Sequence, residues 1–231
     1  MNLNGAYLPM ENKANKSKLF DIRSLPQDIG RIVCIPCLAI FRIKKYNTDG
    51  TKYNSILRGG NLIAANHIDF SDPFIVGTAF WYRRVFFLAS EEIMDVKGRN
   101  ILLRGIGCIR IDRNISDIEG VRRAVDILKS GRVLTVFPQG GIKAEGHIDS
   151  IKSGTILMAL KSGVPIIPMY SEKRRHWYEP RRVVIGEKID CHEHCSGKFP
   201  SMADIEKISQ LLLCSMEECR KTYDRLTKGD K

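Results

Sequence analysis

The sequence predicts an α/β domain with a largely parallel central sheet flanked by helices. Short apolar runs rich in β-branched residues alternate along the chain with longer amphipathic segments of ten or more residues. Strands that alternate with helices of this length indicate βαβ units and a parallel sheet that is covered on both faces. The predicted strands are residues 61–66, 85–90, 108–113, 132–138, 165–171 and 182–187.

Local signals place the helices between these strands. Pro73 suits a first helical position, and Asp72 or Ser71 suits the cap before it. Ser116 and Glu119 fit a capping box, and apolar residues then recur on one face at helical spacing. The predicted helices are residues 73–82, 93–103, 117–129 and 152–161, followed by a C-terminal helix at 202–226 that packs on the sheet.

Composition indicates one substantial core and a surface that attracts polyanions. The chain has 231 residues, 43% of them hydrophobic, and its 37 basic residues against 26 acidic ones give a net charge of +11. Nucleic acid and anionic lipid both fit such a surface. The 7 cysteines are odd in number and scattered, and no secretory signal is apparent at the start, so we expect reduced thiols in a cytoplasmic setting.

The N-terminal region, residues 1–45, is predicted to be a tail with a short membrane-associating segment, and residues 46–231 form the α/β domain. Residues 32–41 read IVCIPCLAIF and are bracketed by basic residues. The run is about half of the ~20 residues that a spanning helix needs, and Pro36 interrupts it. It is either a buried element at the core edge or an interfacial anchor whose flanking cations meet anionic headgroups. We favour the anchor slightly.

Residues 66–72, NHIDFSD, lie where the first predicted strand ends and a helix begins. In open α/β sheets, functional residues gather at the carboxyl ends of strands. A five-residue offset across this turn can bring the Asp72 carboxylate to one imidazole nitrogen of His67 and leave the other facing a cleft. Such a carboxylate fixes the tautomer and stabilises the imidazolium. The pattern is typical of a general base, although it also suits a polar turn with a capping aspartate.

Three further stretches follow in a recognisable order: GIGCIRIDRN at 105–114, VFPQGG at 136–141 and VPIIPMY at 164–170. With NHIDFSD they resemble the four sequence blocks of the glycerolipid acyltransferase family, whose best-known members are 1-acylglycerol-3-phosphate acyltransferases. The resemblance extends over about residues 55–190. It implies His67 as the catalytic base, Asp72 as its orienting partner, and Arg113 as the residue that grips the acceptor's phosphate.

The third block departs from the family pattern, which is usually Phe-Pro-Glu-Gly-Thr. Gln139 stands where the glutamate is expected and Gly141 where the threonine is expected, which removes a negative charge and a hydroxyl. Family members carry an arginine soon after, whereas this chain offers Lys143, which meets a phosphate as a point charge without a bidentate fork. We expect Gln139, Gly140, Gly141 and Lys143 to line the substrate site with Arg113.

Two other clusters carry less specific signals. Residues 191–195, CHEHC, hold four zinc-ligand side chains, but five consecutive residues cannot easily close a tetrahedral site, so no metal site is expected. Residues 173–182, KRRHWYEPRR, combine basic and aromatic side chains. They fit a membrane-facing loop, single-stranded nucleic acid or a solvated surface, and we favour membrane contact.

The predicted function is transfer of a fatty acyl group from acyl coenzyme A or acyl carrier protein to the hydroxyl of a lysophospholipid, most simply 1-acyl-glycerol-3-phosphate. No cofactor beyond this co-substrate is expected, and no nucleic acid partner. The expected location is the cytoplasmic membrane face, in contact with anionic lipids. Two alternatives remain: an acyltransferase with a different hydroxyl or aminoacyl-lipid acceptor, and a basic polyanion-binding protein without catalytic activity.

Overall fold

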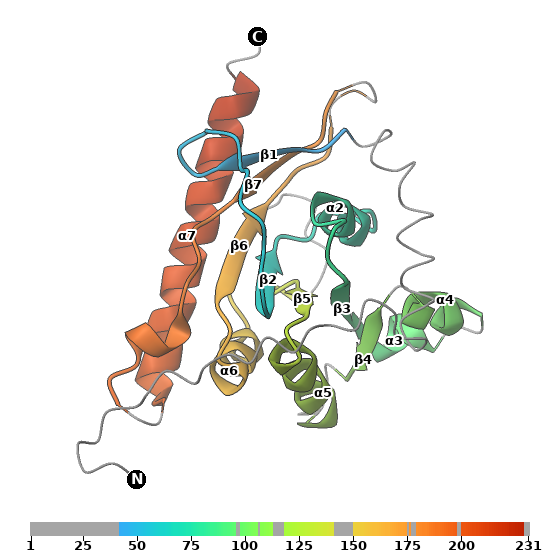
Figure 1. Ribbon diagram of the computed structural model, residues 1–231, viewed down its shortest axis with the longest axis vertical. Coiled ribbons are helices and arrows are strands. Elements are labelled where there is room, and N and C mark those ends of the chain that lie inside the picture. The colour runs from blue at the N-terminus through green and yellow to red at the C-terminus, as the bar shows by residue number, and fades with distance from the viewer. Residues whose placement is uncertain are drawn as a thin grey trace.

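The computed structural model describes residues 42–95, 98–105, 107–112, 118–140, 150–174, 176, 179–197 and 200–228. Across these residues the chain forms one seven-stranded sheet (Figure 1) in the order β1-β7-β6-β2-β5-β3-β4. The strands are β1 Lys44–Asn47, β2 Asn61–Ala65, β3 Val85–Ser90, β4 Cys108–Ile111, β5 Val133–Val136, β6 Ile166–Tyr170 and β7 Arg182–Ile185.

The sheet is parallel except at one neighbour pair. Strands β6 and β7 run antiparallel, whereas the other neighbouring strands pair in parallel. The prediction of a largely parallel α/β sheet is therefore confirmed. The predicted strands correspond to β2 through β7, because continuous apolar runs are what a strand covered on both faces requires.

Helices cover both faces of the sheet, and alternate residues of the central strand β2 pack against the helices on the two faces. Leu62 and Ala64 pack with α5 Ile118–Lys129, α6 Ser153–Ser162 and α7 Met202–Lys228. Ile63 and Ala65 pack on the opposite face with α2 Asp72–Ala79. Every residue of β2 is buried, so the strand that leads to His67 runs through the centre of the core.

Two elements differ from the prediction. The segment 93–103 is two short helices, α3 Glu91–Met94 and α4 Arg99–Gly105, with Gly98 at φ +81° between them. Strand β1 lies in a stretch that the sequence suggested was irregular, because its residues KKYN are polar. Its Lys45 ammonium instead lies 5.7 Å from the ring centres of Tyr53, Phe80 and Tyr82. Burial there lowers the pKa of Lys45.

The predicted membrane-associating segment, residues 32–41, and the capping residue Ser116 lie outside the described residues. Among the helices that the structure does describe, none combines the length and the apolar character needed to cross a bilayer.

Candidate active site

His67 and Asp72 are in contact, as the sequence predicted. Strand β2 ends at Ala65, and the chain turns through His67 into α2, whose first residue is Asp72. His67 Nδ1 lies 3.0 Å from Asp72 Oδ2, and the two side chains are 12% and 4% exposed. The pair therefore sits at the carboxyl end of the central strand, largely shielded from water.

The Asp72 carboxylate also closes the turn that carries His67. Its Oδ2 accepts hydrogen bonds from the backbone N–H groups of Ile68, at 2.6 Å, and Asp69, at 2.9 Å. An ionised carboxylate can only accept, so the proton of a neutral imidazole lies on Nδ1, and Nε2 is left to accept a proton. This is the arrangement that a general base requires.

Arg181 supplies a third contact that the sequence did not reveal. Its Nη2 lies 3.2 Å from Asp72 Oδ1, and its side chain is only 5% exposed. Burial lowers the pKa of Arg181, while the charges of Asp72 and Asp69 act to raise it. The basic stretch 173–182 was interpreted as a membrane-facing surface loop. For Arg181 that interpretation is wrong, because the guanidinium is buried against the carboxylate beside His67.

Asp69 anchors the turn on its outer side. Its Oδ1 accepts hydrogen bonds from the N–H and hydroxyl of Ser71, and its Oδ2 lies 3.5 Å from Lys173 Nζ. Burial acts to raise the pKa of Asp69, but the Ser71 hydrogen bonds and the charges of Arg181 and Lys173 outweigh it and lower the pKa. Two carboxylates thus share the turn, and each has its own cation.

Asn66 fixes the residue before His67. Its Nδ2 donates to the Ser171 carbonyl at 2.9 Å, and its Oδ1 accepts from the Ser171 N–H at 3.0 Å. This two-way bond joins the end of β2 to the end of β6, where the fourth sequence block finishes. The first residue of the NHIDFSD stretch therefore holds the turn that carries His67 to the neighbouring strand.

The third block meets the imidazole directly. Strand β5 pairs with β2, and the Phe137 ring that follows it stacks on the His67 ring with centres 4.1 Å apart and planes inclined by 20°. The Gly140 N–H donates to the Phe137 carbonyl at 3.0 Å and closes a turn that contains Gln139. Gln139 and Gly140 therefore lie in the turn that begins at the ring stacked on His67, and their contact with substrate stays a prediction.

Lys152 lies over this turn and was not singled out from the sequence. Gly140 has φ +76°, and a Cβ built on it would lie 2.4 Å from Lys152 Cε and 2.6 Å from Lys152 Nζ. The Lys152 N–H also donates to the Pro138 carbonyl at 3.1 Å. An ammonium group thus lies against the third block, and a side chain at position 140 would displace the end of Lys152.

Three of the predicted substrate-binding residues, Arg113, Gly141 and Lys143, lie outside the described residues. The second block is described up to Asp112, and its strand β4 lies at the sheet edge, separated from β2 by β5 and β3. The first and third blocks therefore lie on neighbouring strands, whereas the second block lies on the edge strand, two strands farther along the sheet.

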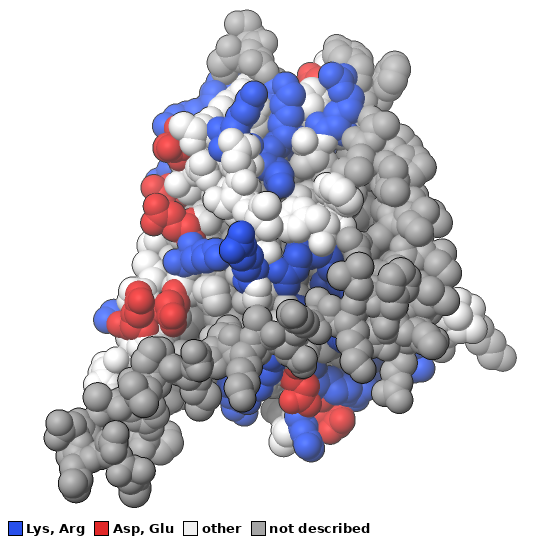
Figure 2. Space-filling model, viewed as in Figure 1, with Lys and Arg blue, Asp and Glu red and all other residues white. Residues whose placement is uncertain are grey.

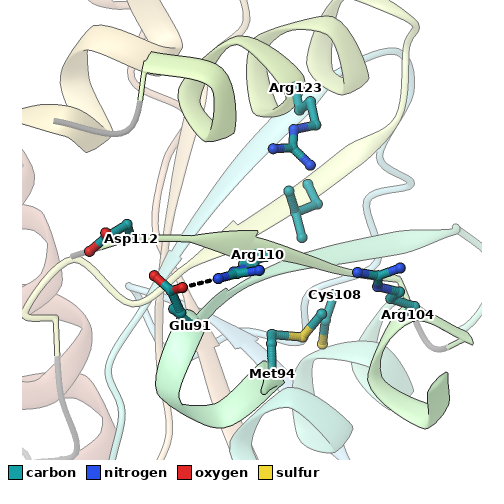
Figure 3. A pocket seen from close by; sticks show the side chains of 8 residues that line it. Glu91, Met94, Arg104, Cys108, Arg110, Asp112 and Arg123 are labelled. Carbon is teal, nitrogen blue, oxygen red and sulfur yellow. Dashed lines mark hydrogen bonds and ion pairs between the residues drawn. The ribbon is translucent and has the colours of Figure 1, made fainter. Parts of the chain in front are cut away.

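The second block lines a hollow of about 620 Å³ between α3, α4 and α5 (Figure 3). Arg110 forms ion pairs there with Glu91 and, at 3.3 Å, with Asp95. Arg123 reaches toward the hollow from α5 and Arg104 from α4. Burial raises the pKa of Cys108 to about 12, so its thiol is not a nucleophile near neutral pH. The lining residues are Glu91, Met94, Arg104, Cys108, Ile109, Arg110, Asp112 and Arg123.

The CHEHC segment forms hydrogen bonds with the protein itself. Cys191–His194 form a short 3₁₀ helix, in which Asp190 accepts a hydrogen bond from the His192 N–H. The imidazole Nε2 of His192 lies 3.1 Å from the Leu160 carbonyl oxygen. Within the described residues, no three His, Cys, Asp or Glu side chains are grouped as a metal site would need.

Comparison with known proteins agrees with the four-block resemblance. Residues 43–172, more than half of the chain, match the family described as Acyltransferase. A 1-acyl-sn-glycerol-3-phosphate acyltransferase of Bacillus subtilis (strain 168) is 22% identical over 189 residues, which cover 80% of this chain and 91% of that protein. One from Borreliella burgdorferi is 32% identical over 110 residues, which cover 47% of this chain and 44% of that protein. The match thus spans less than half the length of the second relative.

The fold has a counterpart among solved structures. The crystal structure of the 1-acyl-sn-glycerophosphate (LPA) acyltransferase PlsC from Thermotoga maritima superimposes with a TM-score of 0.56 and 20% identity, covering 86% of this chain and 81% of that one. At this identity the likeness concerns the fold. The match over residues 43–172 contains His67, Asp72 and the block residues through Tyr170. The chain therefore belongs to the acyltransferase family and is an enzyme of that class.

Proposed function

We propose that this enzyme transfers a fatty acyl group from a thioester of coenzyme A or acyl carrier protein to the free hydroxyl of 1-acyl-glycerol-3-phosphate. The observation that carries the proposal is the buried contact between His67 Nδ1 and Asp72 Oδ2, which leaves the other imidazole nitrogen free to act as a base. The relatives named above support the choice of acceptor, since both are called 1-acyl-sn-glycerol-3-phosphate acyltransferases.

In the proposed reaction, the acceptor hydroxyl attacks the thioester carbonyl carbon as His67 Nε2 takes its proton. The tetrahedral intermediate then collapses: the carbon–sulfur bond breaks, and the leaving thiolate takes the proton back from the imidazolium. A positioned base of this kind typically contributes about 10²- to 10⁴-fold to the rate. No acyl-enzyme forms, and no metal or cofactor is needed, because the base and the thioester supply the whole reaction.

The surrounding residues support each step of this scheme. Asp72 stabilises the imidazolium, and Arg181 in turn neutralises the second oxygen of that carboxylate. Phe137 holds the ring in one orientation by stacking on it. Backbone N–H groups near Gly140 and Gly141 are the proposed donors to the oxyanion, because an oxyanion hole in acyl transfer uses fixed donors of this kind.

The proposed anion-binding residues are Arg113 and Lys143, with Lys152 as a further cation on the third block. Gln139 leaves room for a second candidate acceptor. An amide donates as well as accepts, so a hydroxyl or amine lipid without a phosphate fits this position as readily as lysophosphatidic acid. If Arg113 grips the phosphate, Arg113→Ala raises the KM for lysophosphatidic acid and leaves the KM for the acyl donor unchanged.

The proposed location is the cytoplasmic face of a membrane, where a lipid acceptor enters from the bilayer and the soluble donor from water. Anionic lipids are the proposed membrane partners, because the net charge of +11 favours them. Figure 2 shows that basic side chains gather at the upper end of one face, over β1 and the adjoining strand ends, whereas acidic side chains lie toward its edge.

The experiment that tests the proposed function is thiol release from palmitoyl coenzyme A and from palmitoyl acyl carrier protein, each with and without lysophosphatidic acid. Release that depends on the acceptor supports the proposal and identifies the donor. Release that never depends on lysophosphatidic acid but appears with another lipid supports the second acceptor class and contradicts the first.

A further inference from the structure

The outer face of α2 exposes large aromatic side chains beside the active site. Phe70 is 74% exposed, Phe74 43% and Trp81 54%. Phe70 lies in the catalytic turn itself, between His67 and Asp72, and Phe74 and Trp81 follow along the helix and its end. The opposite side of the helix is an ordinary core face, formed by the buried residues Ile75, Val76, Ala79 and Phe80.

This face is open and carries no charge. Gly77 lies three residues after Phe74 on α2, and a Cβ built on it would meet no atom within 4 Å. Residues 73–82, PFIVGTAFWY, contain no ionisable side chain other than the tyrosine hydroxyl of Tyr82. That hydroxyl accepts a hydrogen bond from the Leu57 N–H. A helix face that met only water would carry polar side chains, so exposed rings without charges indicate an interaction surface.

Basic groups border the aromatic face. Lys173 Nζ, on a side chain that is 61% exposed, lies 3.5 Å from the Asp69 carboxylate, next to Phe70. Figure 2 shows uncharged surface around the position of α2, with lysine and arginine side chains above and below it. An apolar centre with a basic border is complementary to a bilayer that contains anionic lipid, whose acyl region takes the rings and whose phosphates meet the cations.

We propose that the exposed surface formed by Phe70 just before α2, Phe74 and Gly77 on α2, and Trp81 just after it inserts into the surface of an anionic bilayer. The face leads directly to the dyad, since Asp72 is the first residue of α2. A lipid that leaves the bilayer along these rings reaches His67 without crossing water. This inference rests on the proposed function only in assuming that the substrate is a lipid. Contact with the bilayer is measured without any turnover of substrate.

Tryptophan fluorescence of the full chain tests the insertion directly. The chain has 2 tryptophans, so Trp177→Phe leaves Trp81 as the only reporter. The vesicles are equimolar phosphatidylcholine and phosphatidylglycerol, with and without brominated acyl chains. We expect a blue shift and strong quenching by the brominated lipid. Emission from the vesicle-bound protein that is neither shifted nor quenched overturns the proposal, and so does a failure to bind these vesicles at all.

Substitutions separate the face from other contacts. Phe74→Ser and Trp81→Ser should each weaken vesicle partitioning roughly tenfold, given the apolar area of one ring. Ile118→Ser is the matched control, because Ile118 is 77% exposed on α5, and it should leave partitioning unchanged. At Gly77, Leu should strengthen binding and Glu should weaken it. Equal effects of Leu and Glu overturn the proposal, because a mere structural disturbance acts in the same direction for both.

Two further outcomes keep this proposal distinct from the others. If the Gly77 variants change sedimentation of the free protein instead of vesicle binding, the face is an interface between copies of this chain, and the bilayer assignment fails. Vesicle binding by His67→Ala should equal that of the native chain. A protein that binds vesicles through Trp81 but turns over no lysophospholipid retains the bilayer assignment and loses the proposed function.

Discussion

The guanidinium of Arg181 lies 3.2 Å from the carboxylate of Asp72, although 109 residues separate them along the chain. The two oxygens of Asp72 have different partners: Oδ1 contacts Arg181, and Oδ2 contacts His67 and two backbone N–H groups. A charge of this burial is costly unless it is paired and hydrogen-bonded. Arg181, the residue just before β7, therefore supplies the counter-charge for the buried carboxylate beside the imidazole.

Arg181→Met should destabilise the protein and impair catalysis together. Removing one partner of a buried ion pair costs about 3 kcal/mol, because the remaining charge is left without compensation. With the cation gone, the carboxylate that orients His67 loses one of its partners, so kcat should fall as well. Urea unfolding measures the loss of stability, and the rate of thiol release measures the loss of kcat. Lys173→Met is the control, because its exposed pair with Asp69 should contribute less than about 1 kcal/mol. An unchanged kcat in Arg181→Met contradicts the role assigned to Arg181.

Phe137→Leu tests the stack on His67. A stacked aromatic pair is worth about 1 kcal/mol beyond its buried area, and here the ring also fixes the plane of the imidazole. We expect about a tenfold fall in kcat, because a poorly oriented base transfers its proton less efficiently. Phe86→Leu is the control, because the Phe86 ring packs under Arg132 and not on His67. It should lower the stability and leave kcat unchanged. Equal kcat values in the two variants show that the stack does not orient the base.

Gly140→Ala tests the turn of the third block. At φ +76° an L-residue is strained by roughly 1–2 kcal/mol, and the new methyl group also displaces the end of Lys152. Activity should fall further than stability accounts for. Gly59→Ala provides the comparison, since Gly59 has φ +67° and open space around it. Gly59→Ala should lose similar stability and retain full kcat. A matching loss of kcat in Gly59→Ala shows that backbone strain anywhere in the protein lowers kcat, and contradicts a specific role for the turn of the third block.

Stability should decrease in acid through Asp204, near the start of α7. Its carboxylate accepts hydrogen bonds from Ser201 and Ser196, which lower the pKa of Asp204. Because the pKa is lower in the folded state, the stabilisation is complete above the unfolded value of about 3.9 and is lost as the pH falls below it. Asp204→Asn should therefore flatten the decline in unfolding free energy below about pH 4. Asp126→Asn on the solvent side of α5 is the control. An equally flattened dependence of unfolding free energy on pH in that variant contradicts the role given to Asp204.

Local patterns in the sequence predicted most of the sheet and the dyad. Continuous apolar runs identified β2 through β7, and the His67–Asp72 contact lay within one turn, so its spacing was sufficient. Strand β1 was missed because its residues are polar: Lys45 places its cation against three rings, and Tyr46 packs against the core. The segment 93–103 reads as one helix, but Gly98 with positive φ divides it.

Long-range contacts explain what the sequence did not reveal at the site. Arg181 lies in a run of basic residues that suggests a surface, and only the antiparallel return of β7 beside β6 buries it. Lys152 reaches the third block through a backbone bend at Gly140, which no spacing rule identifies. Arg181 depends on how strands distant in the sequence are brought together, and Lys152 depends on how the connection between β5 and α6 folds back, whereas the four blocks each carry their information locally.

The proposed mechanism depends most directly on His67 as the base, and the measurement that tests it is the acceptor-dependent rate of thiol release for the native chain, His67→Ala and Asp72→Asn. We expect His67→Ala to lower kcat by about 10²- to 10⁴-fold, with unchanged folding by circular dichroism and unchanged acceptor binding. Asp72→Asn should lie between the two, because the imidazole remains but loses its counter-charge. A His67→Ala protein that folds normally and keeps its native rate contradicts the mechanism.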